Sequence, residues 1–207
     1  MADDELGLRE RKKLQTRKAL SDAALELVFE RGLENVRRED IAARVGVSTR
    51  TFNNYFPSKF EALAYRQLER MERSVEVLRS RPRDEPLWTA VTTAILAPFE
   101  EDGDFETAPS RARLDRLRTL LAAPEMRGEM SKAVFGADGE LVAAIAERTG
   151  TDRARDLYPR LVSAAIGAAW VAASDLYLSA DPPVPIVPLL RQALAQLAAG
   201  LPDPSTD

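Results

Sequence analysis

Residues 38–59, REDIAARVGVSTRTFNNYFPSK, contain the pattern that decides the fold of this chain. Apolar residues recur at helical spacing between Arg38 and Val45, which predicts a short helix over these residues. Gly46 follows, and glycine adopts the left-handed conformation that ends a helix without a steric penalty from Cβ. The stretch therefore begins with a short helix that stops at a tight turn.

A second helix is expected directly after this turn. Ser48 can cap it by accepting a hydrogen bond from the backbone amide of Thr51. The helix extends over 49–56 and ends at Pro57, because proline cannot continue a helix. Two helices joined by a glycine turn form a helix-turn-helix, whose second helix enters the major groove of DNA. A plain helical hairpin with a polar outer face is the alternative that the pattern alone leaves open.

The second helix has a polar face that needs a partner or water. Phe52 and Phe56 define its buried side, and Tyr55 belongs partly to that side. The polar residues left over are Thr49, Arg50, Thr51, Asn53 and Asn54.

The longer run from Arg17 to Leu63 resembles the DNA-binding domain of the tetracycline-repressor (TetR) family of transcriptional regulators. The matching pieces are AALELV…ERG, then DIAxxxGVSxxTFxxYF, then an SK pair with apolar residues beyond, in the family's order and spacing. Three positions depart from the family pattern. Arg37 stands where a capping Ser or Thr is usual, Asn53 where a tyrosine is common, and Phe60 where an acid is common.

The resemblance implies an all-α protein with an N-terminal three-helix helix-turn-helix domain and a C-terminal helical domain for ligand binding and dimerisation. We expect the DNA-binding domain over 1–56, the effector-binding and dimerisation domain over 57–200, and a loose tail over 201–207. The expected phosphate contacts are Ser48, Thr49, Tyr55 and Lys59, the expected groove-facing residues are Arg50, Thr51, Asn53 and Asn54, and Arg37 and Arg38 complete the predicted DNA-binding set.

The distribution of charge agrees with DNA binding at one end of the chain. The net charge is −4, yet residues 1–60 carry +2 and residues 61–207 carry −6. A weakly basic head on an acidic body suits a protein that contacts phosphate through its head alone. The start, MADDELG, is too acidic for a secretory signal and is expected to be loose. The basic residues that follow predict either contacts with the DNA backbone or a solvated helix start: Arg9, Arg11, Lys12, Lys13, Arg17 and Lys18.

The residue inventory argues against enzymatic activity. The chain has no cysteine and no histidine, which removes a thiolate nucleophile, the commonest general base and the commonest metal ligands. The motifs GxxxxGK[ST], GxSxG and HExxH are absent from the sequence. We therefore expect no enzyme, no metal and no cofactor. The acidic residues Glu100, Glu101, Asp102 and Asp104 are expected on a solvated loop.

The rest of the chain predicts further helices and no strand. The expected helices extend from Ser58 to about Ser80, then over 87–100, 110–123, from Pro124 to about Gly136, and over 141–149. The longest apolar stretch, 152–179, has a core of 13 residues, LVSAAIGAAWVAA, which we expect to be too short to span a bilayer.

Small residues along 152–179 permit close approach of another helix, which predicts either a buried central helix of the protomer or a dimer helix. The next helix repeats leucine at helical spacing, so two helices from each subunit can form a four-helix bundle. The resemblance implies the same homodimer. The predicted interface residues are Leu161, Ala165, Ala168, Ala172, Leu190, Leu194 and Leu197.

The body also carries more large apolar side chains than a dimer seam uses. These residues are either ordinary core or the lining of a mainly apolar pocket, which the resemblance places beside the helix after Ser58. The predicted ligand-binding residues are Trp88, Ile95, Phe99, Met126, Met130, Phe135, Trp170 and Tyr177. The expected effector is an apolar or amphipathic small molecule.

The function expected from these observations is a cytoplasmic, ligand-responsive repressor that binds an inverted-repeat operator as a homodimer. The alternative is a small-molecule-binding or protein-interaction module with a degenerate DNA-binding head. Retention of Thr49, Arg50, Thr51, Tyr55 and Lys59 favours a head that still binds DNA.

Overall fold

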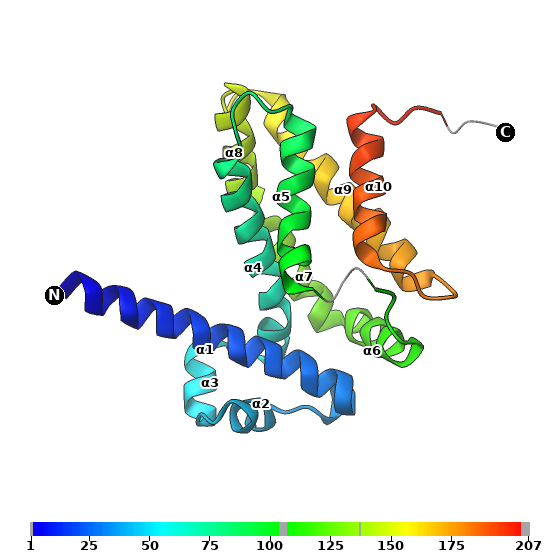
Figure 1. Ribbon diagram of the computed structural model, residues 1–207. Helices are drawn as coiled ribbons and strands as arrows, with labels where there is room; N and C mark the ends of the chain where they lie inside the picture. Colours follow the sequence, from blue (N-terminus) through cyan, green and yellow to red (C-terminus); the bar gives the residue numbers. More distant parts are fainter. Residues whose placement is uncertain (1, 104–106, 137, 204–207) are drawn as a thin grey trace. The chain divides into compact units, whose positions relative to one another are not determined.

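In the computed structural model, residues 2–103, 107–136 and 138–203 are described, with 2–6, 131, 133–136 and 138 described by backbone alone. These residues form ten α-helices and no strand (Figure 1), which confirms the all-α prediction. The helices are α1 (Ala2–Arg31), α2 (Arg38–Val45), α3 (Thr49–Tyr55), α4 (Lys59–Ser80), α5 (Leu87–Asp102), α6 (Arg111–Ala122), α7 (Pro124–Gly136), α8 (Asp138–Thr149), α9 (Leu157–Ser179) and α10 (Ile186–Ala198). A 3-10 turn, η1 (Leu33–Asn35), separates α1 from α2.

The chain divides into two compact units. Unit 1 contains Met1–Leu68 and Asp115–Ala133, and unit 2 contains Glu69–Leu114 and Val134–Asp207. This division follows from which residues pack together within each unit. The functional boundary expected after residue 56 remains a proposal.

Unit 1 is built around the three N-terminal helices. In Figure 1, α1 lies across α2 and α3. The apolar core of the unit contains residues of these three helices and of α4, α6 and α7. An apolar stripe of α1 is buried, as are the aromatic rings of α3 and its C-cap: Leu20, Ala23, Ala24, Leu27, Val28, Phe52 and Phe56. Packing of α3 on this core leaves its opposite face outside.

Local signals set the boundaries of these helices. Gly32 and Gly46 have φ of 84° and 77° and end α1 and α2. The Ser48 hydroxyl accepts a hydrogen bond from the Thr51 amide at 3.1 Å, as the capping pattern predicts. The second helix ends one residue earlier than expected, because Phe56 has an extended backbone with φ of −140° and its ring is buried.

The first residues of the chain differ from the expectation of a loose start. Helix α1 begins at Ala2 and is continuous to Arg31.

Unit 2 is a bundle in which α9 packs against α8 and α10, and α10 packs against α5. One core cluster includes Val91, Ile145 and Ile166, and a second includes Leu96, Phe99 and Val187. Leu194 belongs to the first cluster and Leu190 to the second, and each is 1% exposed within the protomer.

The acidic run after α5 is a second difference from the sequence expectation. Glu100, Glu101 and Asp102 form the last turn of α5, and Asp104 lies outside the described residues. Asp102 follows Phe99 by three residues, so it shares the inner face of the helix. Its side chain is only 7% exposed and accepts hydrogen bonds of 3.0 Å from both Arg70 Nε and Arg73 Nη2. The expectation of a loop is therefore wrong for these three residues, and the expectation of solvation is wrong for Asp102, whereas Glu100 and Glu101 are exposed.

The length and composition of helix α9 do not support the expectation that this stretch is too short to span a bilayer. The helix has 23 residues, with a mean hydropathy of 1.5 over its best 18-residue window, which is long and apolar enough to cross a membrane. Only 28% of that window is buried, although Val162, Ile166 and Ala169 lie in the core of unit 2. The 13-residue run LVSAAIGAAWVAA is shorter than the apolar part of α9, because exposed residues at both ends of the helix are also apolar.

Candidate nucleic-acid interface

Helix α3 presents the polar face that the sequence predicts. Arg50, Asn53 and Asn54 are exposed, while Thr49, Thr51 and Tyr55 are half-buried. Among the described residues, the side chains of Arg50 and Asn54 make no hydrogen bond or ion pair, so both can contact another molecule. The hydroxyls of Ser48 and Thr51 lie 2.8 Å apart, in addition to the capping bond at the start of the helix.

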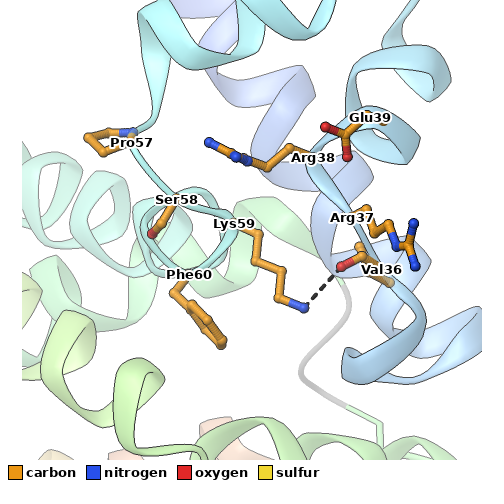
Figure 2. A pocket seen from close by; sticks show the side chains of 8 residues that line it. All are labelled: Val36, Arg37, Arg38, Glu39, Pro57, Ser58, Lys59 and Phe60. Carbon is orange, nitrogen blue, oxygen red and sulfur yellow. Dashed lines mark hydrogen bonds between the residues drawn. The ribbon is translucent and has the colours of Figure 1, made fainter.

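A hollow of about 490 Å³ lies where α2 and α4 begin, and Figure 2 shows the side chains that line it. The lining residues are Val36, Arg37, Arg38, Glu39, Pro57, Ser58, Lys59 and Phe60. Helix N-termini carry free backbone N–H groups and a positive partial charge, which makes them favourable sites for phosphate. Two such termini and three cationic side chains meet at this hollow, so its chemistry suits the DNA backbone.

Arg37 occupies the N-cap position of α2. Its backbone N–H donates to Asp40 Oδ2 at 2.9 Å, which is one half of a capping box. A guanidinium carries donors only, so it cannot accept the reciprocal bond that Ser or Thr would accept. Within the described residues the Arg37 guanidinium has no hydrogen bond or ion pair, and Figure 2 shows it directed away from Arg38. The departure from the family pattern removes a side-chain cap and adds a free cation.

Arg38 connects the start of α2 to α3 by a hydrogen bond. Its Nη1 donates to Asn53 Oδ1 at 3.1 Å, although the two residues are 15 positions apart in sequence. Both side chains are exposed. This pair had no signal in the sequence, because spacing along a chain does not show which side chains of two crossed helices meet.

Lys59 is tied to the turn between α1 and α2. Its Nζ donates to the carbonyl oxygens of Leu33 at 2.8 Å and Val36 at 2.9 Å, and Figure 2 shows the second bond. Burial lowers the pKa of the Lys59 ammonium below its ordinary value, and the carboxylates of Glu125 and Glu34 offset part of this effect. Two of its three N–H donors thus hold η1 and the start of α2 against the start of α4.

Replacing Lys59 with alanine is expected to lower both stability and DNA affinity. The substitution leaves two carbonyls without their donor, and a hydrogen bond to a charged group contributes about 1.5–3 kcal/mol. The free energy of unfolding should fall by at least about 1.5 kcal/mol, and all DNA sequences should bind more weakly because the hollow loses its shape. Urea unfolding and fluorescence anisotropy with labelled DNA measure the two effects.

Arg37→Ala is the matched control, because the Arg37 guanidinium has no partner among the residues that the structure describes. It should leave the urea midpoint unchanged. If Arg37 contacts one phosphate, the slope of log affinity against log salt should fall by about 0.9 for each such contact removed. A Lys59→Ala variant as stable as the wild type would show that the tie to Leu33 and Val36 is not made in solution. A salt slope that also falls in Lys59→Ala would show that its remaining donor reaches a phosphate.

The basic residues of α1 divide into two groups. Arg17 is half-buried, with its guanidinium carbon 4.4 Å from the ring centroid of Tyr65 and 5.2 Å from that of Phe56. This cation–π stacking holds Arg17 at the edge of the core. The remaining basic side chains of this stretch are exposed and suit contacts with a DNA backbone: Arg9, Arg11, Lys12, Lys13 and Lys18.

The residues predicted at the dimer interface lie in two different environments. On α9, Leu161, Ala168 and Ala172 are exposed and Ala165 is half-buried. On α10, Leu197 is half-buried, whereas Leu190 and Leu194 pack inside the protomer. The two buried leucines stabilise the protomer, and the exposed apolar surface belongs mainly to α9, where Leu157 is 73% and Leu161 is 59% exposed.

The residues predicted to bind a ligand do not form one group. In unit 2, Trp88 packs against the cluster that contains Ile95, while Phe99, Trp170 and Tyr177 gather at the other cluster. The rings of Phe99 and Trp170 have centroids 5.6 Å apart. Met126 and Met130 belong to the core of unit 1, and the Phe135 side chain lies outside the described residues. A pocket lined by these residues stays a prediction.

Two protein-family models match this chain, one in its N-terminal part and one in its C-terminal part. Residues 20–64 match the model described as bacterial regulatory proteins, tetR family, and residues 85–202 match the MftR C-terminal domain. The HTH-type transcriptional regulator TcmR of Streptomyces glaucescens is 32% identical over 179 residues, which cover 84% of this chain and 79% of that protein. The putative mycofactocin biosynthesis transcriptional regulator MftR of Mycobacterium tuberculosis is 27% identical over 195 residues, with coverage of 92% and 93%.

Solved structures share the fold at low sequence identity. Thermus thermophilus FadR, a transcriptional repressor crystallised with lauroyl-CoA, superposes with a TM-score of 0.55 at 20% identity, covering 92% of this chain and 97% of that one. A putative regulator from Syntrophomonas wolfei superposes with a TM-score of 0.62 at 14% identity, covering 93% and 100%. At such identities the similarity shows a common architecture.

Proposed function

Since the chain belongs to the TetR family of DNA-binding transcriptional regulators, we propose that it is a repressor that binds an inverted-repeat operator as a homodimer and is released by a small molecule. The observation that carries the proposal is the outer face of α3, where Arg50, Asn53 and Asn54 are exposed and Arg38 connects the helix to the cationic hollow. A protein with this function works in the cytoplasm, where its DNA lies.

The proposed contacts follow from the chemistry of each side chain. Arg50 has a free guanidinium, which can pair bidentately with guanine, and Asn54 has a free amide, which can pair with adenine. Ser48, Thr49, Tyr55 and the hollow at Arg37 are proposed to hold phosphates. Phosphate contacts position the helix, and the residues on its outer face select the sequence.

The exposed apolar stripe of α9 supports a homodimer. Leu157, Leu161, Ala164, Ala168 and Ala172 recur at intervals of three or four residues, so they lie on one face of the helix. An exposed apolar face of this length is typical of a surface that another protein covers. Two copies related by a two-fold axis present two recognition helices, and the operator then has inverted half-sites.

The rival function is a small-molecule-binding or protein-interaction module whose head no longer binds DNA. Selection from a random DNA library, followed by sequencing of the bound fraction, separates the two. A repressor enriches one inverted repeat, bound by two chains per duplex. Binding that is weak and equal for all sequences at about 150 mM salt would favour the rival, because non-specific affinity comes from phosphate contacts alone.

The effector is proposed to be an apolar or amphipathic molecule that binds in unit 2. The cluster around Phe99, Trp170 and Tyr177 supplies aromatic surface, and burial raises the pKa of the Tyr177 hydroxyl, although Arg113 offsets part of that effect. The fold relative from Thermus thermophilus binds lauroyl-CoA, which makes that compound a reasonable first probe here. We propose that the ligand binds better when α4 is tilted differently. Such a tilt would move the two α3 helices of the homodimer apart, beyond the spacing of successive major grooves.

Thermodynamic linkage gives this switch a quantitative test. If the ligand lowers operator affinity by some factor, the operator must lower ligand affinity by the same factor. Trp88 and Trp170 are the two tryptophans of the chain, so titration with lauroyl-CoA can be followed by their fluorescence, with and without the selected operator. A compound that quenches the tryptophans yet binds equally well in both titrations would contradict the switch.

A further inference from the structure

The hydrogen bond between Arg38 and Asn53 orients the Asn53 amide. Arg38 Nη1 donates to Asn53 Oδ1 at 3.1 Å. A guanidinium has donors and no acceptor, so the amide can bond to it only through its oxygen. One of the two lone pairs of Oδ1 is therefore engaged, and among the described residues both hydrogens of Nδ2 remain available.

This arrangement weakens the usual way in which asparagine reads adenine. A free asparagine pairs with adenine through two bonds, accepting from N6 and donating to N7. Arg38 engages one of the two lone pairs of Oδ1 and places a positive charge beside the other, which disfavours a bond from the N6 amino group, while Nδ2 keeps both of its donors. Guanine presents two acceptors, O6 and N7, at its major-groove edge, and it has no donor there to oppose the amide.

We infer that Arg38 is a positioning residue that biases Asn53 towards donating to the base and makes it select guanine over adenine. This inference rests on the proposed entry of α3 into the major groove. Within the described part of the chain, the bond to Asn53 is the sole hydrogen bond of the Arg38 guanidinium, which has no ion pair there. No neighbouring carboxylate therefore competes with Asn53 for it.

The placement of Arg38 in the hollow makes the pairing available at the interface. In Figure 2 the Arg38 side chain extends from the start of α2 towards the segment that carries Pro57, and it lies on the opposite side from the Arg37 guanidinium. The two neighbouring arginines thus differ in their contacts. Within the described residues the Arg37 guanidinium has no partner, whereas Arg38 orients a side chain of α3.

The experiment compares DNA selected from a random library by four proteins: the wild type, Arg38→Met, Arg38→Lys and Arg37→Met. We expect the wild type to enrich guanine at one position of each half-site. In Arg38→Met the ratio of adenine to guanine at that position should rise at least about fivefold, which is the lower end of the discrimination by a bidentate pair. Arg38→Lys keeps a charge and donors, so it should retain guanine.

Arg37→Met is the matched control, because it removes the same charge from the adjacent residue without touching Asn53. It should weaken binding with every base preference unchanged. Asn53→Ala identifies the position that Asn53 reads, since preference there should disappear. The double variant Arg38→Met, Asn53→Ala should then show the same base preferences as Asn53→Ala, because Arg38 acts at that position through Asn53.

Two outcomes would overturn the inference. One is an Arg38→Met protein that binds more weakly with no change in base preference at any position. The other is a change at a position that Asn53→Ala leaves unaffected. A wild-type protein that enriches no inverted repeat would instead contradict the proposed function, so the two failures are distinguishable. Circular dichroism melts confirm that each variant is folded.

Discussion

Replacing Ala168 with tryptophan is expected to raise the dissociation constant of the proposed homodimer at least about 30-fold. Ala168 is exposed on α9, in line with Leu161 and Ala172, so the protomer has room for the larger side chain. An overpacked contact costs about 1–3 kcal/mol, and a two-fold interface contains the substitution twice, which gives at least about 2 kcal/mol. Since about 1.4 kcal/mol is a factor of ten, the dimer dissociates and operator affinity falls with it.

Analytical ultracentrifugation gives the dimer constant, and anisotropy with the selected operator gives the DNA affinity. Ala122→Trp is the control, because Ala122 is an exposed alanine on a different helix, α6. It should leave both constants unchanged, and both variants should keep the wild-type melting temperature. A wild-type protein that is monomeric at micromolar concentration, or an Ala168→Trp dimer as tight as the wild type, would contradict the α9 interface.

Replacing Asp102 with asparagine is expected to lower the free energy of unfolding by about 3–5 kcal/mol. The Asp102 side chain is 7% exposed and that of Arg70 is 9% exposed, so the variant removes the charge of a buried carboxylate that accepts from two guanidinium groups. Breaking one partner of a buried ion pair is far more destabilising than losing a surface pair. The Arg70 guanidinium also lies 4.9 Å from the centroid of the Phe99 ring, so its displacement would loosen that packing.

The same contact predicts how stability depends on pH. Burial by itself would raise the pKa of Asp102, but the hydrogen bond from Arg73 and the charge and hydrogen bond of Arg70 lower it overall. A carboxyl whose pKa is lower in the folded state contributes its full stability above its unfolded pKa and loses it as the pH falls through the folded value. Asp102→Asn should therefore be less sensitive to acid than the wild type below about pH 4.

Glu101→Gln is the matched control for this pair. Glu101 also bonds to Arg73, at 2.9 Å, but its side chain is 62% exposed. An exposed ion pair contributes about 0–1 kcal/mol, so this variant should unfold at nearly the wild-type urea concentration. An Asp102→Asn protein with wild-type stability and wild-type acid sensitivity would show that the buried pair is not formed.

The sequence alone determined the helix-turn-helix, because each of its signals acts over a few residues. Gly46 can take positive φ wherever it stands, Ser48 needs only the amide of Thr51, and Phe52 and Phe56 define one face of a single short helix. Such local preferences are present in the chain before it folds, so they predict the residues of α2 and nearly all of α3. They also predict that Arg50 and Asn54 lie outside.

Which of several side chains that look alike in the sequence contacts a partner depends on the tertiary structure. Leu190 and Leu161 look alike in an apolar pattern, yet one is core of the protomer and the other is exposed, because burial depends on which helices pack together. Asp102 lies in an acidic run, but two arginines more than 25 residues away in sequence make it a buried ion-pair partner. Lys59 and Asn53 have side chains suited to DNA, and their neighbours in space occupy two donors of Lys59 and one acceptor lone pair of Asn53. Contacts between residues far apart in sequence depend on the geometry of the packed helices, and periodicity along a single helix does not contain that geometry.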